Sequence, residues 1–438
     1  MRRFRWLALV VVGVMVMAAC SDDSSVTPGS DGTGGGEENK GTVNVLSAGE
    51  PEEAAAYQAV VDDLINADTD YVAEIEFTGD FEPQVQIRSE AGTLDVILLP
   101  QVGAVADQAA SGNAVSLEDM GFDMTELEGL FGEYFLSLGE YQGEHYGIPT
   151  NINLKSMVWY PKDDFDAAGY AVPTTWDEML ALSDQIVADG GTPWCVGFGS
   201  EAATGWPATD WIEDIMLRTA GLDVYTQWYK HEIPFNDPAV ANAAELFGDI
   251  MFTDGYVLGG AENTPSVPFA DAPLPMFEDP PGCWLHRQAS FINASFPPDS
   301  EAGVDYDWFP LPPIDQEGTL FAGELAVVFS NRPEIVDFVT KFMGEEVQCA
   351  LGGVPASSRI SPNVNVGPDC YANDILADAS VILTDALANG TGGFDASDLM
   401  PPAVGSGAFW TGMVEYMQGG PESLQGILDD IEAAWPAS

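Results

Sequence analysis

The chain has 438 residues, and its 13 Lys and Arg stand against 70 Asp and Glu, for a formal net charge of −57. A field of that sign repels nucleic acid and anionic ligands, so a neutral or cationic ligand is favoured. Adaptation to a saline habitat, where salt screens the repulsion, explains the same composition. The charge therefore excludes nucleic acid as a partner without identifying the ligand.

The chain begins with an expected export signal. Arginines at positions 2, 3 and 5 precede an apolar run over 6–17, which ends in small residues and Cys20. This order is typical of a secretory signal. The alternative, a membrane-spanning helix, needs roughly 20 apolar residues, and the run is shorter. Because a Cys in this position resembles the lipobox of bacterial lipoproteins, we expect a signal peptide over 1–20 and lipid on Cys20.

Residues 21–40 are rich in Ser, Asp, Gly and Glu and have no apolar periodicity. Such a segment buries too little surface to offset its ordering entropy, so we expect a flexible tether. The roughly 400 residues that follow are too many for one compact core and fit two lobes.

Strand and helix patterns alternate at the start of this body. The ranges 42–46, 71–77 and 95–99 read as strands, and 57–64 and 84–91 as helices. Strands that alternate with helices predict a parallel sheet with crossover helices. Ligands bind beyond the carboxyl ends of such strands, so the loops at 49–50 and 100–101 should lie over a site.

The rest of the body is more mixed. Extended structure is expected over 151–160 and 323–330, and helices over 176–189, 211–219 and 333–342, with Thr175 as an N-cap. A Pro-rich and aromatic stretch over 265–313 predicts ordered, irregular loops. From 372 onward the pattern is mostly helical, with an interruption over 390–402.

Four cysteines follow Cys20. An even number in an oxidising compartment predicts two disulfides, although three pairings are possible from sequence alone. We favour Cys349 with Cys370, which closes a short loop, and Cys195 with Cys283. Each would stabilise the fold by roughly 3–5 kcal/mol. A zinc site is the weaker alternative, because there is no C-x-x-C pair and the three histidines are scattered, so we expect no metal or cofactor.

No catalytic signature occurs: G-x-S-x-G, H-E-x-x-H and the P-loop pattern are all absent from the sequence. The carboxylates are so numerous that a glycosidase-like pair can always be chosen, and such a pair indicates nothing. Instead, aromatic residues stand beside polar ones over 205–211 and over 394–410. Trp offers a broad apolar face at low entropy cost, and carboxylates and amides hydrogen-bond hydroxyls, which is the chemistry that sugars require.

Several segments resemble the extracellular sugar-binding proteins of bacterial ABC importers, most closely the α-glucoside-binding branch. They are Tyr146-Gly147-Ile148-Pro149, Asn153-Leu154-Lys155-Ser156, Val158-Trp159-Tyr160-Pro161, Gly169-Tyr170, Pro173-Thr174-Thr175-Trp176-Asp177-Glu178, Pro193-Trp194-Cys195, Gly205-Trp206-Pro207-Ala208-Thr209-Asp210-Trp211, Cys283-Trp284-Leu285-His286-Arg287-Gln288-Ala289 and the run over 395–401.

The resemblance implies an α/β fold of the two-lobe periplasmic-binding-protein type (type II, a clamshell), with a mainly parallel sheet flanked by helices in each lobe. We expect lobe 1 over 41–152 and 307–345, and lobe 2 over 153–306 and 346–438. The implied function is capture of an oligosaccharide, an α-glucoside such as maltose, trehalose or sucrose, for delivery to a permease. The resemblance also implies a monomer without enzymatic activity, exported and lipid-anchored at the outer face of the cytoplasmic membrane.

The resemblance further implies which residues contact sugar. Trp410 matches a stacking aromatic of the family, and Glu324 follows Ala322-Gly323 where relatives commonly show Gly-Gly-Asp. The full expected set is Glu50, Gln101, Asn151, Trp206, Asp210, Arg287, Glu324, Asp398 and Trp410.

Three residues near these segments have competing interpretations. Trp211 has apolar helical neighbours, so a core position is favoured over a ligand contact. A Lys in an apolar strand is costly unless it is paired, so Lys155 should be anchored by carboxylates. Arg287 could hydrogen-bond a ligand bidentately or brace the Pro-rich loops.

Other classes of function stay open from the residues alone: a secreted hydrolase, a surface protein whose aromatics meet another protein, and a receptor for a peptide or polyamine.

Overall fold

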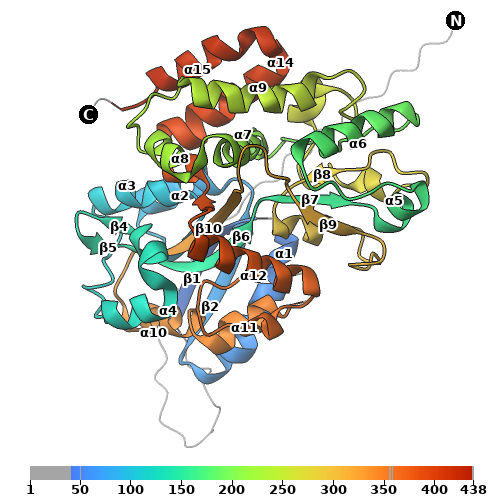
Figure 1. The fold of residues 1–438 in the computed structure, drawn as a ribbon. Coiled ribbons are helices and arrows are strands. Elements are labelled where there is room, and N and C mark those ends of the chain that lie inside the picture. The colour runs from blue at the N-terminus through green and yellow to red at the C-terminus, as the bar shows by residue number, and fades with distance from the viewer. Residues whose placement is uncertain (1–40, 50, 355–356, 358, 437–438) are drawn as a thin grey trace, which may run out of the picture. The chain divides into compact units, whose positions relative to one another are not determined.

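The computed structural model describes residues 41–49, 51–354, 357 and 359–436 (Figure 1). The expected signal peptide, Cys20, the tether and Glu50 lie outside these residues. The body from residue 40 onward forms one compact unit by its internal contacts. Among the described residues, no helix combines the length and the apolar character that a membrane crossing requires.

A six-stranded sheet lies at the centre of one part of the body, with the strand order β11-β10-β3-β1-β2 and with β6 also paired to β10. Its strands are β1 (Gly41–Ala48), β2 (Tyr71–Thr78), β3 (Val96–Leu99), β6 (Gly147–Leu154), β10 (Thr319–Val328) and β11 (Gly392–Phe394). β1 is parallel to both β2 and β3, which confirms the prediction for this segment. β10 runs antiparallel to β3 and β6.

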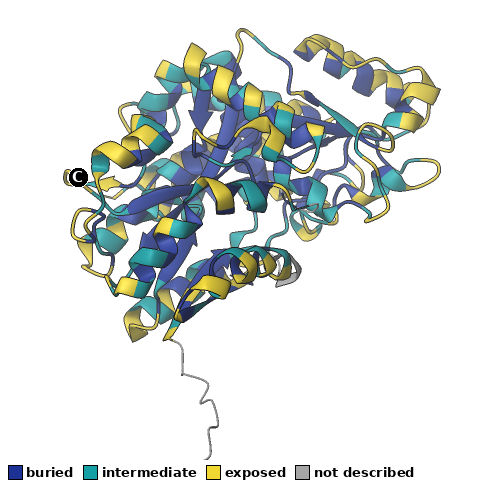
Figure 2. Cartoon of the chain, turned by 90° about the horizontal axis from the view of Figure 1, so that it is seen from below, coloured by how far each residue is buried: buried dark blue, intermediate teal, exposed yellow. Residues whose placement is uncertain are grey.

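The hydrophobic pattern explains how this sheet is covered. β2 alternates, so Tyr71, Ala73, Ile75 and Phe77 are buried between more exposed residues, whereas all of β3 is buried. Figure 2 shows buried strands beneath helices whose outer faces are exposed. The helices of this part are α1 (Pro51–Leu64), α2 (Phe81–Ala91), α3 (Val105–Ala110), α4 (Met124–Ser137), α10 (Pro333–Phe342), α11 (Glu345–Gly352) and α12 (Asp374–Asn389).

A second, three-stranded sheet has the order β8-β7-β9, formed by β8 (His286–Arg287), β7 (Met157–Tyr160) and β9 (Asp307–Pro310). A largely helical core packs with it. The helices here are α5 (Lys162–Ala168), α6 (Trp176–Ala188), α7 (Trp206–Thr219), α8 (Gly221–Tyr229), α9 (Pro238–Phe252), α13 (Ala396–Leu399), α14 (Trp410–Gly419) and α15 (Leu424–Ala433). A small hairpin pairs β4 (Glu140–Tyr141) with β5 (Glu144–His145).

Two details differ from the expected architecture. The three-stranded sheet is antiparallel, not mainly parallel, because β7 pairs with β8 and β9 in opposite directions. The expected lobe boundaries at 307 and 346 also disagree with the pairing. β9 belongs to the small sheet, while α11 and α12 pack with α1, β6 and β10 of the large sheet. The chain therefore crosses between the sheets after β6, after β9 and after β11.

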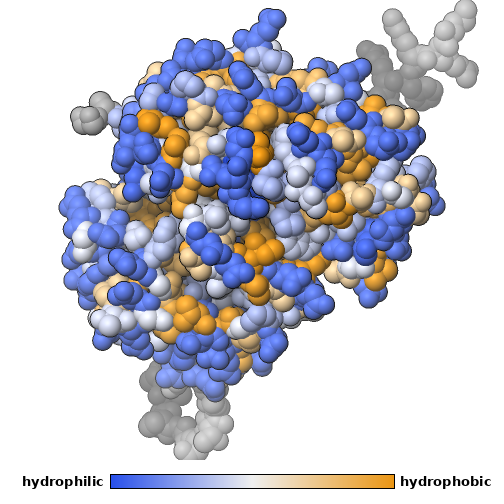
Figure 3. Space-filling view, in the orientation of Figure 1, coloured by the Kyte–Doolittle hydropathy of each residue, from blue (hydrophilic) through white to orange (hydrophobic). Residues whose placement is uncertain are grey.

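Other local predictions are confirmed. α10 has the expected bounds, and the Thr175 hydroxyl accepts a hydrogen bond from the Glu178 backbone N–H at the start of α6. The structure contains the two favoured disulfides, Cys195–Cys283 and Cys349–Cys370. Figure 3 shows a face covered largely by hydrophilic side chains with apolar patches between them, as the acidic composition requires.

Candidate functional site

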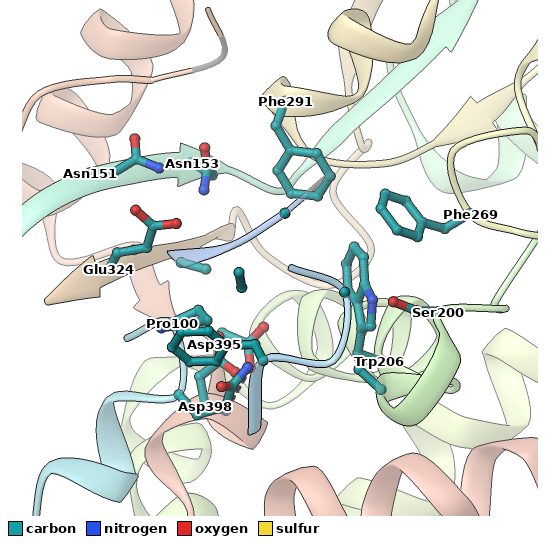
Figure 4. A pocket seen from close by; sticks show the side chains of 18 of the residues that line it. Pro100, Asn151, Asn153, Ser200, Trp206, Phe269, Phe291, Glu324, Asp395 and Asp398 are labelled. Atoms are coloured by element: carbon teal, nitrogen blue, oxygen red, sulfur yellow. Dashed lines mark hydrogen bonds between the residues drawn. The ribbon is translucent and has the colours of Figure 1, made fainter. Parts of the chain in front are cut away.

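A pocket opens at the carboxyl ends of β1, β2 and β3 (Figure 4). Gly49 follows β1, Thr78 is the last residue of β2, and Pro100 and Gln101 follow β3, and all of them line the pocket. The remaining lining comes from β6, β10, the start of α7 and the segment around α13 and α14. Ligands bind beyond the carboxyl ends of parallel strands, and the sequence predicts a site at the loops 49–50 and 100–101 for this reason. The pocket lies at the predicted end of the sheet.

One wall of the pocket is polar and comes from the two long strands β6 and β10. Asn151 and Asn153 project from the same face of β6, two residues apart, opposite Glu324 of β10 (Figure 4). The β10 register shifts at a bulge directly after Glu324, a feature that commonly re-aims a side chain. Buried amide oxygens of Gln101, Asn151 and Asn153 have no hydrogen-bond partner in the described protein. These atoms are available to hydroxyl donors of a ligand.

Glu324 has its own cation. An Arg359 Nη2 donates to its Oε2 at 3.0 Å, and the guanidinium lies 5.2 Å from the centre of the Tyr57 ring. Burial raises the pKa of Glu324 and the pairing with Arg359 opposes that shift. Arg359 Nε is buried and has no hydrogen-bond partner among the residues that the structure describes, so the pair keeps a donor for a ligand.

The facing wall is aromatic. The ring of Trp206 lies 5.2 Å from that of Phe269 and 5.8 Å from that of Phe291, and all three line the pocket (Figure 4). Tilted and edge-on contacts of this kind hold each ring in place and leave part of its face free. Trp410 completes this side of the lining at 4 % exposure, and its indole N–H has no hydrogen-bond partner in the described part of the chain.

The two tryptophans are held by a close backbone contact. Gly205, the N-cap of α7, has φ of 114°, a conformation that favours glycine. A Cβ at this position would lie 2.2 Å from the Trp410 carbonyl oxygen. Trp206 is the first residue of α7 and Pro207 is the second. The missing N–H of Pro207 costs nothing, because the first N–H groups of a helix have no partner within the helix. A π-helical turn, Ala403–Phe409, leads into Trp410.

Below the aromatic wall lies a buried cluster of charges. Lys155 Nζ donates to Asp210 Oδ1 at 2.8 Å and to Asp395 Oδ2 at 2.5 Å. The same ammonium lies 5.1 Å from the centre of the Trp206 ring, a cation–π distance. Although burial alone would lower the pKa of Lys155, Asp210 and Asp395 raise it, so the residue stays charged. The prediction that carboxylates anchor Lys155 is confirmed.

Two more acids complete this cluster. Both oxygens of Glu213 accept hydrogen bonds from the backbone N–H groups of Ala396 and Ser397 at the start of α13. Asp398, on the same short helix, lines the pocket. Burial first, and then the neighbouring Asp395, raise the pKa of Glu213 and of Asp398 well above the usual range. For Asp395, burial acts in the same direction but Lys155 outweighs it and lowers the pKa.

Asp210, Glu213 and Asp395 are close enough together to ligate a metal ion, but the ammonium of Lys155 already contacts two of them. The structure thus places a protein cation between these carboxylates.

A second charged group lies deeper. Arg287 donates to the Asp210 carbonyl and to Asp214 Oδ2, each at 3.0 Å, and its guanidinium lies over the Trp211 ring. Arg218 pairs with the other oxygen of Asp214. Trp211 is 1 % exposed and packs on Trp194, so the favoured core position is confirmed.

The structure brings six of the expected contact residues together on the pocket lining: Gln101, Asn151, Trp206, Glu324, Asp398 and Trp410. Asp210 and Arg287 are not on the lining, because they pair in the layer below it. Glu50 lies outside the described residues. Sequence reasoning missed Asn153, Phe269, Phe291 and Arg359; only Asn153, two residues from Asn151 in an expected strand, had a recognisable signal.

This chain belongs to the bacterial extracellular solute-binding protein family, whose model matches residues 48–348. It is 36% identical over 441 residues to the osmoprotective compounds-binding protein GgtB of Synechocystis sp., across 99% of this chain and 100% of that protein. It is 38% identical over 415 residues to the alpha-glucosides-binding periplasmic protein AglE of Rhizobium meliloti, across 91% of this chain and 88% of the other.

Solved structures share the fold at low sequence identity. The solute receptor AcbH, described with a preference for β-D-galactopyranose, superposes with a TM-score of 0.73 at 18% identity, over 90% of this chain and 98% of that chain. Maltose-bound T. maritima MalE3 gives a TM-score of 0.69 at 14% identity, over 90% and 99%. The fold is therefore the two-lobe, type II solute-binding fold that the sequence predicts.

Proposed function

We propose that this protein captures an oligosaccharide, an α-glucoside such as maltose, trehalose or sucrose, and delivers it to the permease of an ABC importer. The observation that carries the proposal is the pocket itself, in which Trp206, Phe269 and Phe291 face Asn151, Asn153 and Glu324. The apolar C–H face of a pyranose packs on the rings while its hydroxyls meet the amide and carboxylate oxygens. The name of the alpha-glucosides-binding relative AglE supports the ligand class.

Binding would also couple to closure. The lining comes from strands of the large sheet and from helices that share a hydrophobic core with the small sheet, so one sugar would bridge both parts. A bridging ligand stabilises the closed arrangement by its difference in affinity between the two states. The permease would then recognise the closed form.

Titration calorimetry and thermal unfolding with maltose, trehalose, sucrose and longer α-glucans test the proposal, with galactose and raffinose as contrasting sugars. Ligand at 100 times its dissociation constant adds about 2.7 kcal/mol to stability. Recovery of the sugar unchanged excludes a hydrolase. Silence from every α-glucoside would overturn the proposal.

The lipid anchor at Cys20 belongs to the same proposal, because a tethered receptor stays near its permease. Cys20→Ser should move the protein from the membrane fraction to the soluble fraction of the producing cell without changing sugar affinity. An unchanged membrane fraction would contradict the anchor.

A further inference from the structure

Asp398 is a carboxyl group of the pocket whose side chain has no hydrogen-bond or ion-pair partner among the described residues. Asp398 lines the pocket and is 6 % exposed, yet its carboxylate makes no hydrogen bond or ion pair with any other described residue. Only its backbone N–H is bonded, to Asp395 Oδ1 at 2.9 Å. A buried carboxyl group without a partner is costly, so the arrangement calls for an explanation.

The surrounding charges do not supply a cation. Lys155 is shared between Asp210 and Asp395, while Arg218 and Arg287 are shared between Asp214 and Asp210. Together with Glu213 and Asp398, five carboxyl groups therefore meet three cations in this cluster. Glu82, in the first turn of α2, also lines the pocket and adds another carboxyl neighbour. The titratable and charged groups that face Asp398 from the packed elements are Glu82, Lys155, Asp210, Glu213 and Asp395.

Glu324, a second carboxylate of the same pocket, has the cationic partner that Asp398 lacks. Its Oε2 lies 3.0 Å from Arg359, so its charge is balanced before any ligand arrives. Asp398 differs because it has no such cation and lines the pocket, so a ligand in the pocket can supply the positive charge.

We propose that the pocket binds carbohydrates bearing a basic amine in preference to their neutral counterparts, with the ligand's ammonium group paired to Asp398. This inference rests on the proposed function and narrows its ligand class. It agrees with the negative field of the whole chain, which attracts cations to the pocket mouth.

The protonation of Asp398 explains how the empty pocket tolerates the group. Burial and the neighbouring Asp395 raise the pKa of Asp398, which favours its protonated form in the empty pocket. When the ammonium arrives, that proton leaves to solvent and the carboxylate pairs with the ligand instead. Lys155 opposes the approach of a second cation only weakly, because Asp210 and Asp395 neutralise it at 2.8 Å and 2.5 Å. The preference should therefore increase as the pH rises from about 5 toward the pKa of the ligand amine.

Calorimetry on the full mature protein tests this with trehalose, maltose and their mono-amino derivatives substituted at different ring carbons. At least one amino derivative should bind roughly tenfold or more tightly than its parent, as close buried charge pairs commonly do. The preference should persist in about 0.5 M salt, which screens the surface field but not a buried pair.

Variants separate the pocket from the surface charge. In Asp398→Asn, and in Asp398→Ser as a second replacement, the ratio of amino to parent affinity should fall to about one. Asp223→Asn makes the same change in net charge at an exposed position of α8, and it should leave the ratio unchanged.

The outcomes distinguish the two proposals. If the parent sugars bind and no amino derivative binds more tightly, the inference is overturned and the proposed function stands. A ratio that survives in both Asp398 variants overturns the assignment to Asp398. Amino derivatives that bind while every neutral parent is silent support the inference and overturn capture of neutral α-glucosides. Silence from both sets overturns both.

Discussion

The two walls of the pocket handle buried charge differently. On the wall from β6 and β10, Glu324 is matched by one arginine and the remaining polar atoms are neutral amides. Beneath the wall from α7, α13 and α14, carboxyl groups outnumber cations and the two acids left over have raised pKa values. The carboxylate of the first wall therefore has a protein cation of its own, whereas in the second the raised pKa values of Glu213 and Asp398 favour their protonated forms.

The largest expected effect comes from removing the one ammonium of the second wall. Lys155→Met leaves Asp395 buried without a cation and Asp210 with Arg287 alone, and it should cost about 3–5 kcal/mol of unfolding free energy. Arg359→Met, on the first wall, should cost less, because the side chain of its partner Glu324 is 13% exposed. Urea denaturation of both variants measures the difference, and equal losses would remove the distinction between the walls.

The two tryptophans should separate stability from binding. Trp410 is 4 % exposed, so Trp410→Ala should cost about 3–5 kcal/mol of stability. Trp206 is partly exposed at the pocket, so Trp206→Ala should cost less stability while weakening sugar affinity roughly tenfold or more. Urea denaturation and calorimetry of each variant provide the measurements. Unchanged affinity in Trp206→Ala would remove this ring from the binding surface.

Neutralising Glu324 and neutralising Asp398 should change the stability of the protein in opposite directions. Glu324→Gln leaves Arg359 without its charged partner and should cost about 1–3 kcal/mol. Asp398→Asn removes a carboxyl group that has no partner and should leave the melting temperature unchanged or higher. Thermal unfolding of the ligand-free proteins compares them directly. A clear loss in Asp398→Asn would show that the group has a stabilising partner after all.

The smallest effect is a difference in pH dependence. An acid whose pKa is raised by folding binds more protons in the native state, so its contribution is present at low pH and is lost as pH rises through the folded pKa. For Asp398 that window begins at its ordinary value of 3.8 and extends upward. Each unit within it is worth about 1.4 kcal/mol, so stability should decline less steeply with pH in Asp398→Asn than in the unchanged protein. Parallel profiles from about pH 5 to pH 8 would contradict the raised pKa.

Much of the fold followed from local pattern. The first three strands and α10 were predictable because alternation and helical spacing are strong there, and Pro333 marks a helix start. The antiparallel small sheet was not, since β8 has only two residues within an irregular, Pro-rich segment. Which sheet β9 joins depends on long-range pairing that no local pattern encodes.

The site divides in the same way. Gln101 was predictable because it follows a parallel strand, and Trp206 because Gly and Pro flank it. Asp210 was misplaced because α7 begins at Trp206, not at 211, so Asp210 lies one helical turn further in and reaches Lys155. Phe269, Phe291 and Arg359 come from loops and a short turn without periodicity, and only the folded chain brings them to the pocket.

The contact between Gly205 and the Trp410 carbonyl has a consequence for altering this receptor. No side chain larger than hydrogen fits at Gly205, because its backbone lies against the Trp410 carbonyl. A substitution at this contact therefore cannot move the indole of Trp206 without also moving that of Trp410. Any substitution that separates Gly205 from the Trp410 carbonyl shifts both aromatic surfaces together. New selectivity is therefore easier to introduce from the opposite side, where the amides of β6 can be exchanged one at a time.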